Sequence, residues 1–222
     1  MFRKFNYYWL LILIPIGFIA WFFLSKKDEA PIRSLAYFGP KNFLKVNDTT
    51  YHFIPDFEFT DQNNKKVNKL TVKNKIYVTE YFFTTCKSIC PVMNTNLEKI
   101  YKEFKPNRDF LILSHTVNPE NDGASVLKEY ANLHGVKDGR WLFLTGSKKA
   151  LYELARKGYL LNAEEGDGGE EDFIHTQNFA LIDKESHIRG FYDGTDSLEI
   201  VRLTQDIKLL LKEYEYKSKN NN

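Results

Sequence analysis

Cysteine is scarce in this sequence: its 222 residues include only Cys86 and Cys90, which lie in one short segment. All thiol chemistry is therefore confined to that segment. A neighbouring pair with no other thiol is typical of an oxidising compartment, whereas free cysteines scattered through a core indicate a reducing one. We therefore expect the domain to lie outside the inner membrane, on the periplasmic side in a bacterium.

The sequence also lacks an excess of charge of either sign. Its 31 Lys and Arg against 29 Asp and Glu leave a formal charge of +2. This balance excludes nucleic-acid binding driven by counterion release, so we expect no nucleic-acid partner. With 43% hydrophobic and 27% charged residues, the composition argues against wholesale disorder. The length fits one domain, or one domain with an appendage.

Charge is absent altogether from Phe5 to Ser25, a run of 21 residues. A helix of this length spans roughly 31 Å, which matches the hydrocarbon core of a bilayer, and aromatic residues flank both ends of the run. A cleaved signal peptide is the alternative, but no small-x-small cleavage pattern or lipobox cysteine follows Ser25. The run predicts a single transmembrane anchor over residues 1–25.

Strand-like and helical patterns alternate after residue 50, which is typical of an α/β domain. The expected elements are a hairpin, a strand, a helix, a strand, a helix, a strand, a helix, a hairpin and a helix. Their ranges are 53–59 with the stretch around 67, 76–83, 91–104, 109–117, 125–136, 141–144, 147–161, 179–182 with 187–192, and 197–216. This order predicts a thioredoxin-like fold over residues 51–216, with an extra N-terminal β-hairpin and an inserted helix. We expect residues 26–50 to form an irregular linker and residues 217–222 a disordered tail.

The two cysteines are expected where the buried strand 76–83 passes into a helix, because Pro91 suits a first helical turn. Unpaired N–H groups and the helix dipole favour a thiolate there, and Lys87 adds positive charge. The four-residue spacing suits either a disulfide or a shared soft metal ion. A static structural disulfide is a further alternative, although so short a loop constrains the unfolded chain little.

Proline is missing from the entire chain after Pro119. A thioredoxin-type reductase needs a cis-proline just before the penultimate strand, and none can occur here. The corresponding stretch, 172–178, instead contains His175. Two thiolates and an imidazole form a possible metal-ligand set.

Several segments carry a resemblance to a known family: the Thr85–Pro91 segment after strand 76–83, residues 117–120 and 126–131, residues 141–146, and His175 ahead of 179–183. They resemble the SCO/SenC family of membrane-anchored copper chaperones for cytochrome oxidase assembly. The resemblance covers nearly the whole chain after the anchor. Two positions depart from the family pattern, because Lys87 stands where proline is usual and Asn118 where aspartate is usual.

The resemblance implies a thioredoxin-like domain in which Cys86, Cys90 and His175 bind one copper ion. It further implies delivery of that ion to the binuclear copper centre of a cytochrome c oxidase, whose copper-bearing subunit is the partner. Other copper chaperones or thiol-disulfide proteins are further expected partners. The chemistry agrees, since thiolates suit Cu(I) and an imidazole also suits Cu(II), with zinc as the competing metal.

The leading hypothesis is therefore a metallochaperone, which is not an enzyme, held in the inner membrane by a single span. The alternative is a membrane-tethered thiol-disulfide oxidoreductase in which Cys86 and Cys90 form the redox dithiol and reduce partner cysteines before metal loading. A peroxidase is a third reading, without a supporting signature. His115 is a weaker ligand candidate than His175. The acidic segment 164–172 is expected to be a mobile loop, or alternatively to dock a basic partner.

Overall fold

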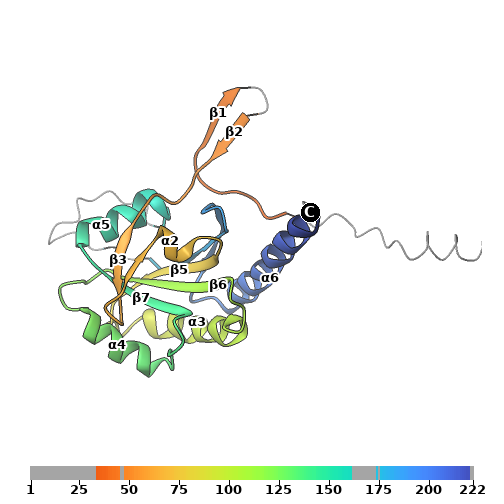
Figure 1. Ribbon diagram of the computed structural model, residues 1–222. Coiled ribbons are helices and arrows are strands. Elements are labelled where there is room, and N and C mark those ends of the chain that lie inside the picture. The colour runs from red at the N-terminus through yellow and green to blue at the C-terminus, as the bar shows by residue number, and fades with distance from the viewer. Residues whose placement is uncertain (1–33, 46–47, 162–173, 175, 221–222) are drawn as a thin grey trace, which may run out of the picture. The chain divides into compact units, whose positions relative to one another are not determined.

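The computed structural model describes residues 34–45, 48–161, 174 and 176–220 (Figure 1). The predicted anchor over residues 1–25 and the first part of the predicted linker lie outside these ranges. Within them, no helix is both long enough and apolar enough to cross a membrane.

A seven-stranded mixed sheet forms the centre of the domain, in the order β4-β3-β7-β6-β5-β8-β9. The three central strands β5, β6 and β7 are parallel, and the strands on both sides are antiparallel. The bounds are β3 Glu58–Asp61, β4 Lys66–Asn68, β5 Ile76–Phe82, β6 Phe110–Thr116, β7 Trp141–Thr145, β8 Asn178–Ile182 and β9 Ile188–Asp193. The sheet confirms the predicted α/β class, and both predicted hairpins are present as β3–β4 and β8–β9.

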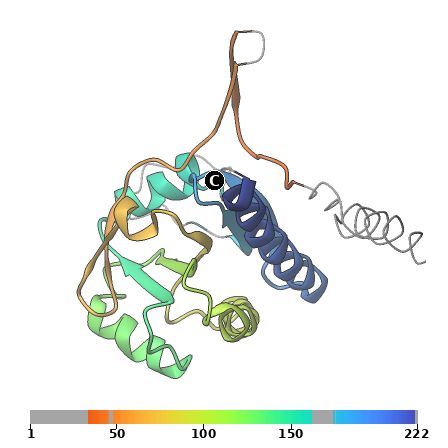
Figure 2. The same cartoon turned by 45° about the vertical axis from the view of Figure 1, so that its right-hand side comes forward.

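Helices cover both faces of the sheet (Figures 1 and 2). The helices α3 (Cys90–Phe104), α4 (Ala124–Leu133) and α6 (Ser197–Asn220) contribute to one hydrophobic core. The short α2 (Lys69–Val72) and α5 (Lys148–Glu153), which continues into the π-helical turn Leu154–Gly158, contribute to a second core on the other face. Such a three-layer arrangement is that of a thioredoxin-like fold.

The central strand β5 is buried along its whole length. Its alternate side chains enter the two cores: Ile76, Val78 and Phe82 pack against the α3 side, and Tyr77 and Tyr81 against the α5 side. A parallel strand covered on both faces requires this continuous apolar run. The sequence pattern of residues 76–83 reflects that requirement.

Two expectations about the ends of the domain are wrong. Residues 41–51 are not an irregular linker but a separate β-hairpin, β1 (Lys41–Lys45) and β2 (Asp48–Tyr51). This hairpin is held by backbone pairing, which leaves no apolar periodicity in the sequence. The tail from residue 217 is helical to Asn220, since Lys217 pairs with Glu213 one turn earlier at 2.8 Å. Residues 221–222 lie outside the described ranges.

Two other predicted elements differ in detail. The helix expected over residues 147–161 ends as an α-helix at Glu153 and finishes as the π-helical turn, whose Gly158 carbonyl lies 2.7 Å from Nε2 of His52. The strand expected from Phe53 begins only at Glu58. The short α2 was not predicted, because its four residues are too few for a helical period, although Asn68 caps it.

A buried ion-pair cluster closes one end of the domain around Arg189 of β9. Its guanidinium lies 2.9 Å from the Asp183 carboxylate and 3.2 Å from the Glu213 carboxylate, and the Arg189 side chain is fully buried. The same guanidinium donates to the backbone carbonyls of Leu35 at 2.7 Å and Ala36 at 3.2 Å. The cluster therefore ties β9, the β8–β9 turn and α6 to the chain that enters the domain.

Residues 34–38, which we call the entry segment, are held by further contacts. The ring of Tyr37 lies 4.2 Å from the Arg189 guanidinium carbon and stacks on Tyr51 at 4.3 Å. The amide of Phe38 donates to the carbonyl of Ile188 at 2.9 Å. The entry segment is therefore part of the folded domain, although the sequence predicted a linker there.

Replacing Arg189 by alanine should lower the free energy of unfolding by about 3–5 kcal/mol, because it leaves the fully buried Asp183 carboxylate without a cation. Urea denaturation measures this loss. The matched control is Arg202→Ala, which removes an exposed arginine paired with Glu199 and should cost less than about 1 kcal/mol. Equal losses in the two variants would contradict a stabilising role for the cluster.

Candidate dithiol and metal site

The two cysteines lie at the junction of β5 and α3. Cys86 is half-buried in the loop that follows β5, and Cys90 is the first residue of α3 and only 3% exposed. Both are free thiols. The predicted position between strand and helix is confirmed, and Pro91 occupies the first helical turn as expected. Cys86 lies before the helix, however, so the two sulfurs do not share one helical turn.

The two thiols have opposite tendencies to ionise. Partial burial opposes ionisation of Cys86, but hydrogen bonds from Cys90 and Ser88 outweigh it and lower the pKa to about 7. Burial raises the pKa of Cys90 to about 12, and its hydrogen bond to Cys86 acts in the same direction. Near pH 7 the site therefore holds a partly exposed Cys86 that is about half ionised and a buried Cys90 that stays protonated.

Asp122 fixes the loop that carries Cys86, and sequence reasoning did not find it. Its carboxylate accepts hydrogen bonds from the hydroxyl of Thr84 at 2.5 Å and the backbone amide of Thr84 at 3.2 Å. It also accepts from the hydroxyl of Thr116, at the end of β6, at 2.5 Å. The signal in the sequence was that Asp122 supplies a carboxylate four residues after Asn118, the position where aspartate is usual. Among the described residues, the Asn118 side chain itself accepts a hydrogen bond only from Asn121.

A second residue that the sequence analysis missed is Glu80, a fully buried carboxyl in β5 on the α3 side. Burial raises its pKa to about 8, although the Ser114 hydroxyl donates to it at 2.6 Å. The indole N–H of Trp141 in turn donates to Ser114 at 2.8 Å. Glu80 contributes to the raised pKa of Cys90. A single carboxylate in an otherwise apolar strand was the signal that could have identified it.

The predicted ligand His175 and the acidic segment 164–172 lie outside the described residues. The preceding residue, Ile174, packs in the core on the α5 side. Among the described residues, no group of three His, Cys, Asp or Glu side chains is arranged to hold a metal ion. The three-ligand set therefore stays a prediction.

The weaker candidate His115 is a core residue. Its ring packs against Phe59, Tyr81 and Tyr159, and its Nδ1 lies 3.1 Å from the Thr79 hydroxyl. Burial lowers its pKa to about 3. Since it projects into the core on the α5 side, it has no contact with the thiols on the α3 side.

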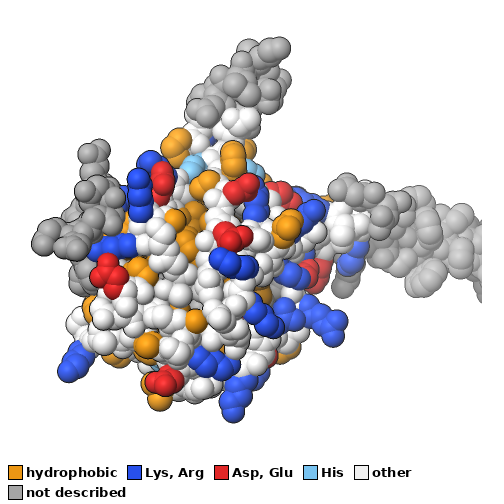
Figure 3. All heavy atoms as spheres, turned by 60° about the vertical axis from the view of Figure 1, so that its left-hand side comes forward, with side chains coloured by type: hydrophobic (Ala, Val, Ile, Leu, Met, Phe, Trp, Pro, Cys, Tyr) orange, Lys and Arg blue, Asp and Glu red, His pale blue; other side chains and the backbone are white. Residues whose placement is uncertain are grey.

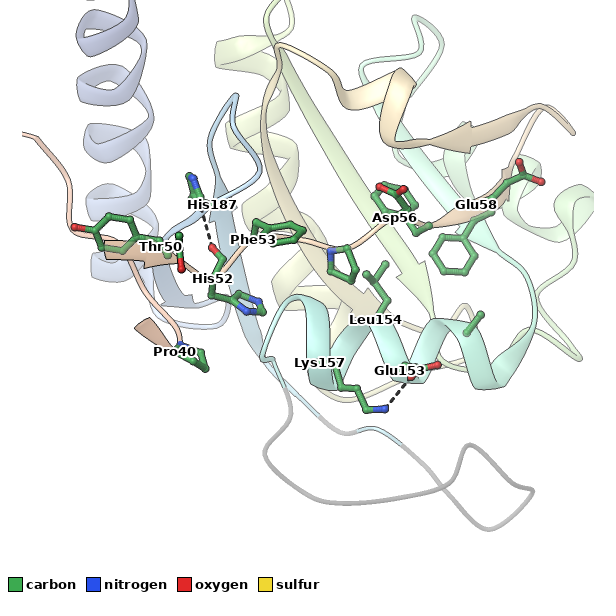
Figure 4. Close-up of a pocket in the computed structure, with 15 residues that line it drawn as sticks. Pro40, Thr50, His52, Phe53, Asp56, Glu58, Glu153, Leu154, Lys157 and His187 are labelled. Carbon is green, nitrogen blue, oxygen red and sulfur yellow. Dashed lines mark hydrogen bonds and ion pairs between the residues drawn. The ribbon is translucent and has the colours of Figure 1, made fainter. Parts of the chain in front are cut away.

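A cavity of about 860 Å³ opens on the α5 side of the domain, between residues 50–59 and α5 (Figures 3 and 4). Figure 4 shows Phe53 and Leu154 among its lining residues, with Glu153 paired to Lys157. Neither cysteine lines this cavity. The dithiol therefore lies outside this cavity.

The thiol of Cys86 has a lowered pKa, and the buried thiol of Cys90 follows it at the start of α3. Together with the fold, this pair defines a thioredoxin-like dithiol domain. Comparison with known families makes the assignment specific, since residues 46–212 match the SCO1/SenC family. The chain therefore belongs to the SCO1/SenC family, as its resemblance predicted.

Three relatives illustrate this membership. The "SCO1 protein homolog" of Bacillus subtilis is 28% identical over 166 residues, which cover 74% of this chain and 86% of the relative. The structure of BsSco, described as a member of the Sco family of cytochrome c oxidase assembly proteins with a disulfide switch, is 28% identical with a TM-score of 0.61 and covers 73% of this chain and 95% of that one. Arabidopsis thaliana ScoI with copper bound is 22% identical with a TM-score of 0.56, covering 70% of this chain and 98% of that one, and shows the fold alone.

The thiol pKa values lead to a testable difference in reactivity. The rate of Cys86 alkylation by iodoacetamide should rise with pH and reach half its maximum near pH 7, because the thiolate is the reacting species. Cys90 should react far more slowly at every pH below its raised pKa. Mass spectrometry of labelled peptides follows both thiols.

The variant Ser88→Ala tests the cause of the low pKa. It removes a hydroxyl 3.6 Å from the Cys86 sulfur, so the alkylation midpoint should move to higher pH. Thr95→Ala is the control, because that hydroxyl donates to the carbonyl of Pro91 one turn further along α3. Identical pH profiles for Ser88→Ala and the parent would contradict the assigned hydrogen bond.

Proposed function

We propose that this chain is a membrane-anchored copper chaperone that binds one copper ion through Cys86, Cys90 and His175 and delivers it to the binuclear copper centre of a cytochrome c oxidase. The observation that carries the proposal is the paired thiols of Cys86 and Cys90 in a SCO1/SenC family domain. The family relatives include a protein described as belonging to the cytochrome c oxidase assembly proteins. The oxidase subunit that bears copper is the proposed partner.

The donor chemistry supports copper as the cargo. About half of the Cys86 population is thiolate at pH 7, and a soft thiolate favours Cu(I). Cys90 must lose its proton before it can coordinate, and a bound cation lowers a thiol pKa strongly. An imidazole from His175 would complete a three-coordinate set. With Cys86 partly exposed, a partner's thiolate can approach the ion and replace the ligands one at a time.

The proposed location follows from the uncharged run. Residues 5–25 would cross the inner membrane once, and the dithiol domain would lie on the extracytoplasmic side, where the oxidase copper centre is also expected. Both parts of this location remain proposals, because the run lies outside the described residues.

Competitive titration of the reduced, full-length protein with Cu(I) tests the ligand set. The parent should bind one ion tightly against a chelator, the double variant Cys86→Ser/Cys90→Ser should bind none, and His175→Ala should bind at least tenfold more weakly. His187→Ala is the matched control, since Nδ1 of His187 donates to the carbonyl of His52, far along the chain from the thiols. Equal affinities for parent and His175→Ala would remove His175 from the site.

A second function is favoured by the unequal thiols: a membrane-tethered thiol-disulfide oxidoreductase. Cys86 thiolate would attack a partner disulfide, forming a mixed disulfide and releasing one partner thiolate. Cys90 would then lose its proton, attack the Cys86 sulfur and release the second partner thiolate. The dithiol gives up two electrons and becomes a disulfide, while the partner gains two thiols ready for metal.

The variant Cys90→Ser separates the two thiols in this reaction. It should accumulate a mixed disulfide between Cys86 and a disulfide-bonded peptide, because the resolving thiol is gone. Cys86→Ser should accumulate almost none, since Cys90 is buried and protonated. Non-reducing gel electrophoresis reads the result. Equal trapping by both variants would contradict the assigned roles.

A further inference from the structure

The N-terminal ends of the three parallel strands form a basic end of the domain. Lys75 precedes β5, Arg108 lies two residues before β6, and Arg140 precedes β7. The Lys75 ammonium and the Arg140 guanidinium both donate to the backbone carbonyl of Arg108, at 2.9 Å and 3.1 Å. We call these residues, together with Lys184 of the β8–β9 turn, the basic end.

The basic side chains at this end of the domain have few carboxylate partners, so the surface there keeps a net positive charge. Asp109 lies 2.5 Å from Lys184 and 3.6 Å from Lys75, so one carboxylate serves two ammonium groups. The exposed side chain of Arg108 has no carboxylate partner among the described residues. Three more exposed lysines, Lys73, Lys105 and Lys137, precede β5, β6 and β7. The neighbouring carboxylates are Glu103, which pairs with Lys208, and Asp138 and Glu185.

The basic end is opposite the dithiol. Lys75 stands immediately before β5, and the loop with Cys86 follows the other end of this seven-residue strand. At about 3.3 Å per residue, the two ends are separated by roughly 23 Å. The carboxylates of Asp193 and Glu199 lie at the end of β9 and the start of α6 instead. The basic end therefore lies at the edge of the sheet away from the dithiol.

The entry segment lies at the same basic end. Arg189, which holds the entry segment, is paired with Asp183, the residue before Lys184. Figures 1 and 2 both show the entry segment beside the C-terminal part of α6. In the sequence, only residues 26–33 separate the uncharged run from Ser34, and eight residues span at most about 29 Å. A bilayer that held the run would thus lie within about 29 Å of Ser34, by chain length alone.

We propose that the basic end binds the anionic headgroups of the bilayer, so that the dithiol faces away from the membrane surface. The inference rests on the proposed anchor. Anionic lipid attracts basic side chains near its surface, and each contributes about a fivefold factor to binding. Because the entry segment is fixed to the domain, the basic end can stay directed at the headgroups. A free linker over the 25 residues 26–50 would instead let the domain turn in any direction.

Hydrogen exchange of the full-length chain in lipid nanodiscs tests this orientation. Amides of residues 105–109, 137–140 and 183–187 should exchange at least about fivefold more slowly in nanodiscs containing phosphatidylglycerol than in nanodiscs of phosphatidylcholine alone. The double variant Arg108→Glu/Lys137→Glu should abolish the difference. Both side chains are exposed and have no ion-pair partner among the described residues, so the fold should be kept. Lys149→Glu/Lys157→Glu, on the helical segment 148–158, is the control with the same change in charge.

Three outcomes would decide the proposal. Exchange rates that are equal in the two lipids would overturn it and leave the basic end free for an acidic protein. Loss of the difference in the control variant as well would also overturn it, because net charge alone would then explain the effect. If the chain does not stay with neutral nanodiscs, the anchor proposal fails. Flotation with anionic vesicles then decides: recovery abolished by Arg108→Glu/Lys137→Glu supports the basic end, and no recovery overturns it.

Discussion

The rest of the domain depends on β5 being paired on both sides and buried on both faces. It pairs in parallel with β6 from Ile76 to Phe82 and antiparallel with β8 at its beginning. This pairing fixes the direction of the strand, and hence which end of the sheet receives Lys75 and which receives Cys86. Burial on both faces also explains why a carboxyl such as Glu80 stays protonated there, since a charge in that position has no solvent. The two ends of one strand therefore carry the dithiol of the proposed copper site and the basic end of the proposed membrane contact.

The unequal thiols suit both proposed activities for one physical reason. A partly exposed thiolate can meet a metal ion or a disulfide, and a buried thiol beside it stays inactive until the first has reacted. Hydrogen bonds from Cys90 and Ser88 create the difference within one loop. Asp122 holds that loop through Thr84, so the geometry does not depend on the thiols being bonded to each other. Copper transfer and disulfide exchange are thus two uses of one local arrangement.

The buried cluster around Arg189 fixes the entry segment, which the sequence predicted to be part of an irregular linker. An arginine held by two carboxylates can keep an otherwise irregular segment in place, because releasing the Leu35 and Ala36 carbonyls would leave donors of the buried guanidinium without acceptors. The chain therefore enters the domain at a defined place. For the proposed membrane-anchored chaperone, a defined entry point would restrict the orientations available to the domain.

The sequence by itself determined the order of elements and the dithiol, since buried strands need continuous apolar runs and Pro91 marks a helix start. It also determined the family, through Cys86, Cys90 and the segments around them. The roles of Arg189, Asp122 and Glu80 were decided only by the tertiary structure, since their contacts join residues far apart in the chain. Hairpin β1–β2 is local, but it is held by backbone pairing that leaves no apolar pattern in the sequence. Arg189 meets Leu35 across more than 150 positions, and no local pattern encodes such a pair. The pKa difference between Cys86 and Cys90 likewise arises from burial and hydrogen bonds, which exist only once the chain has folded.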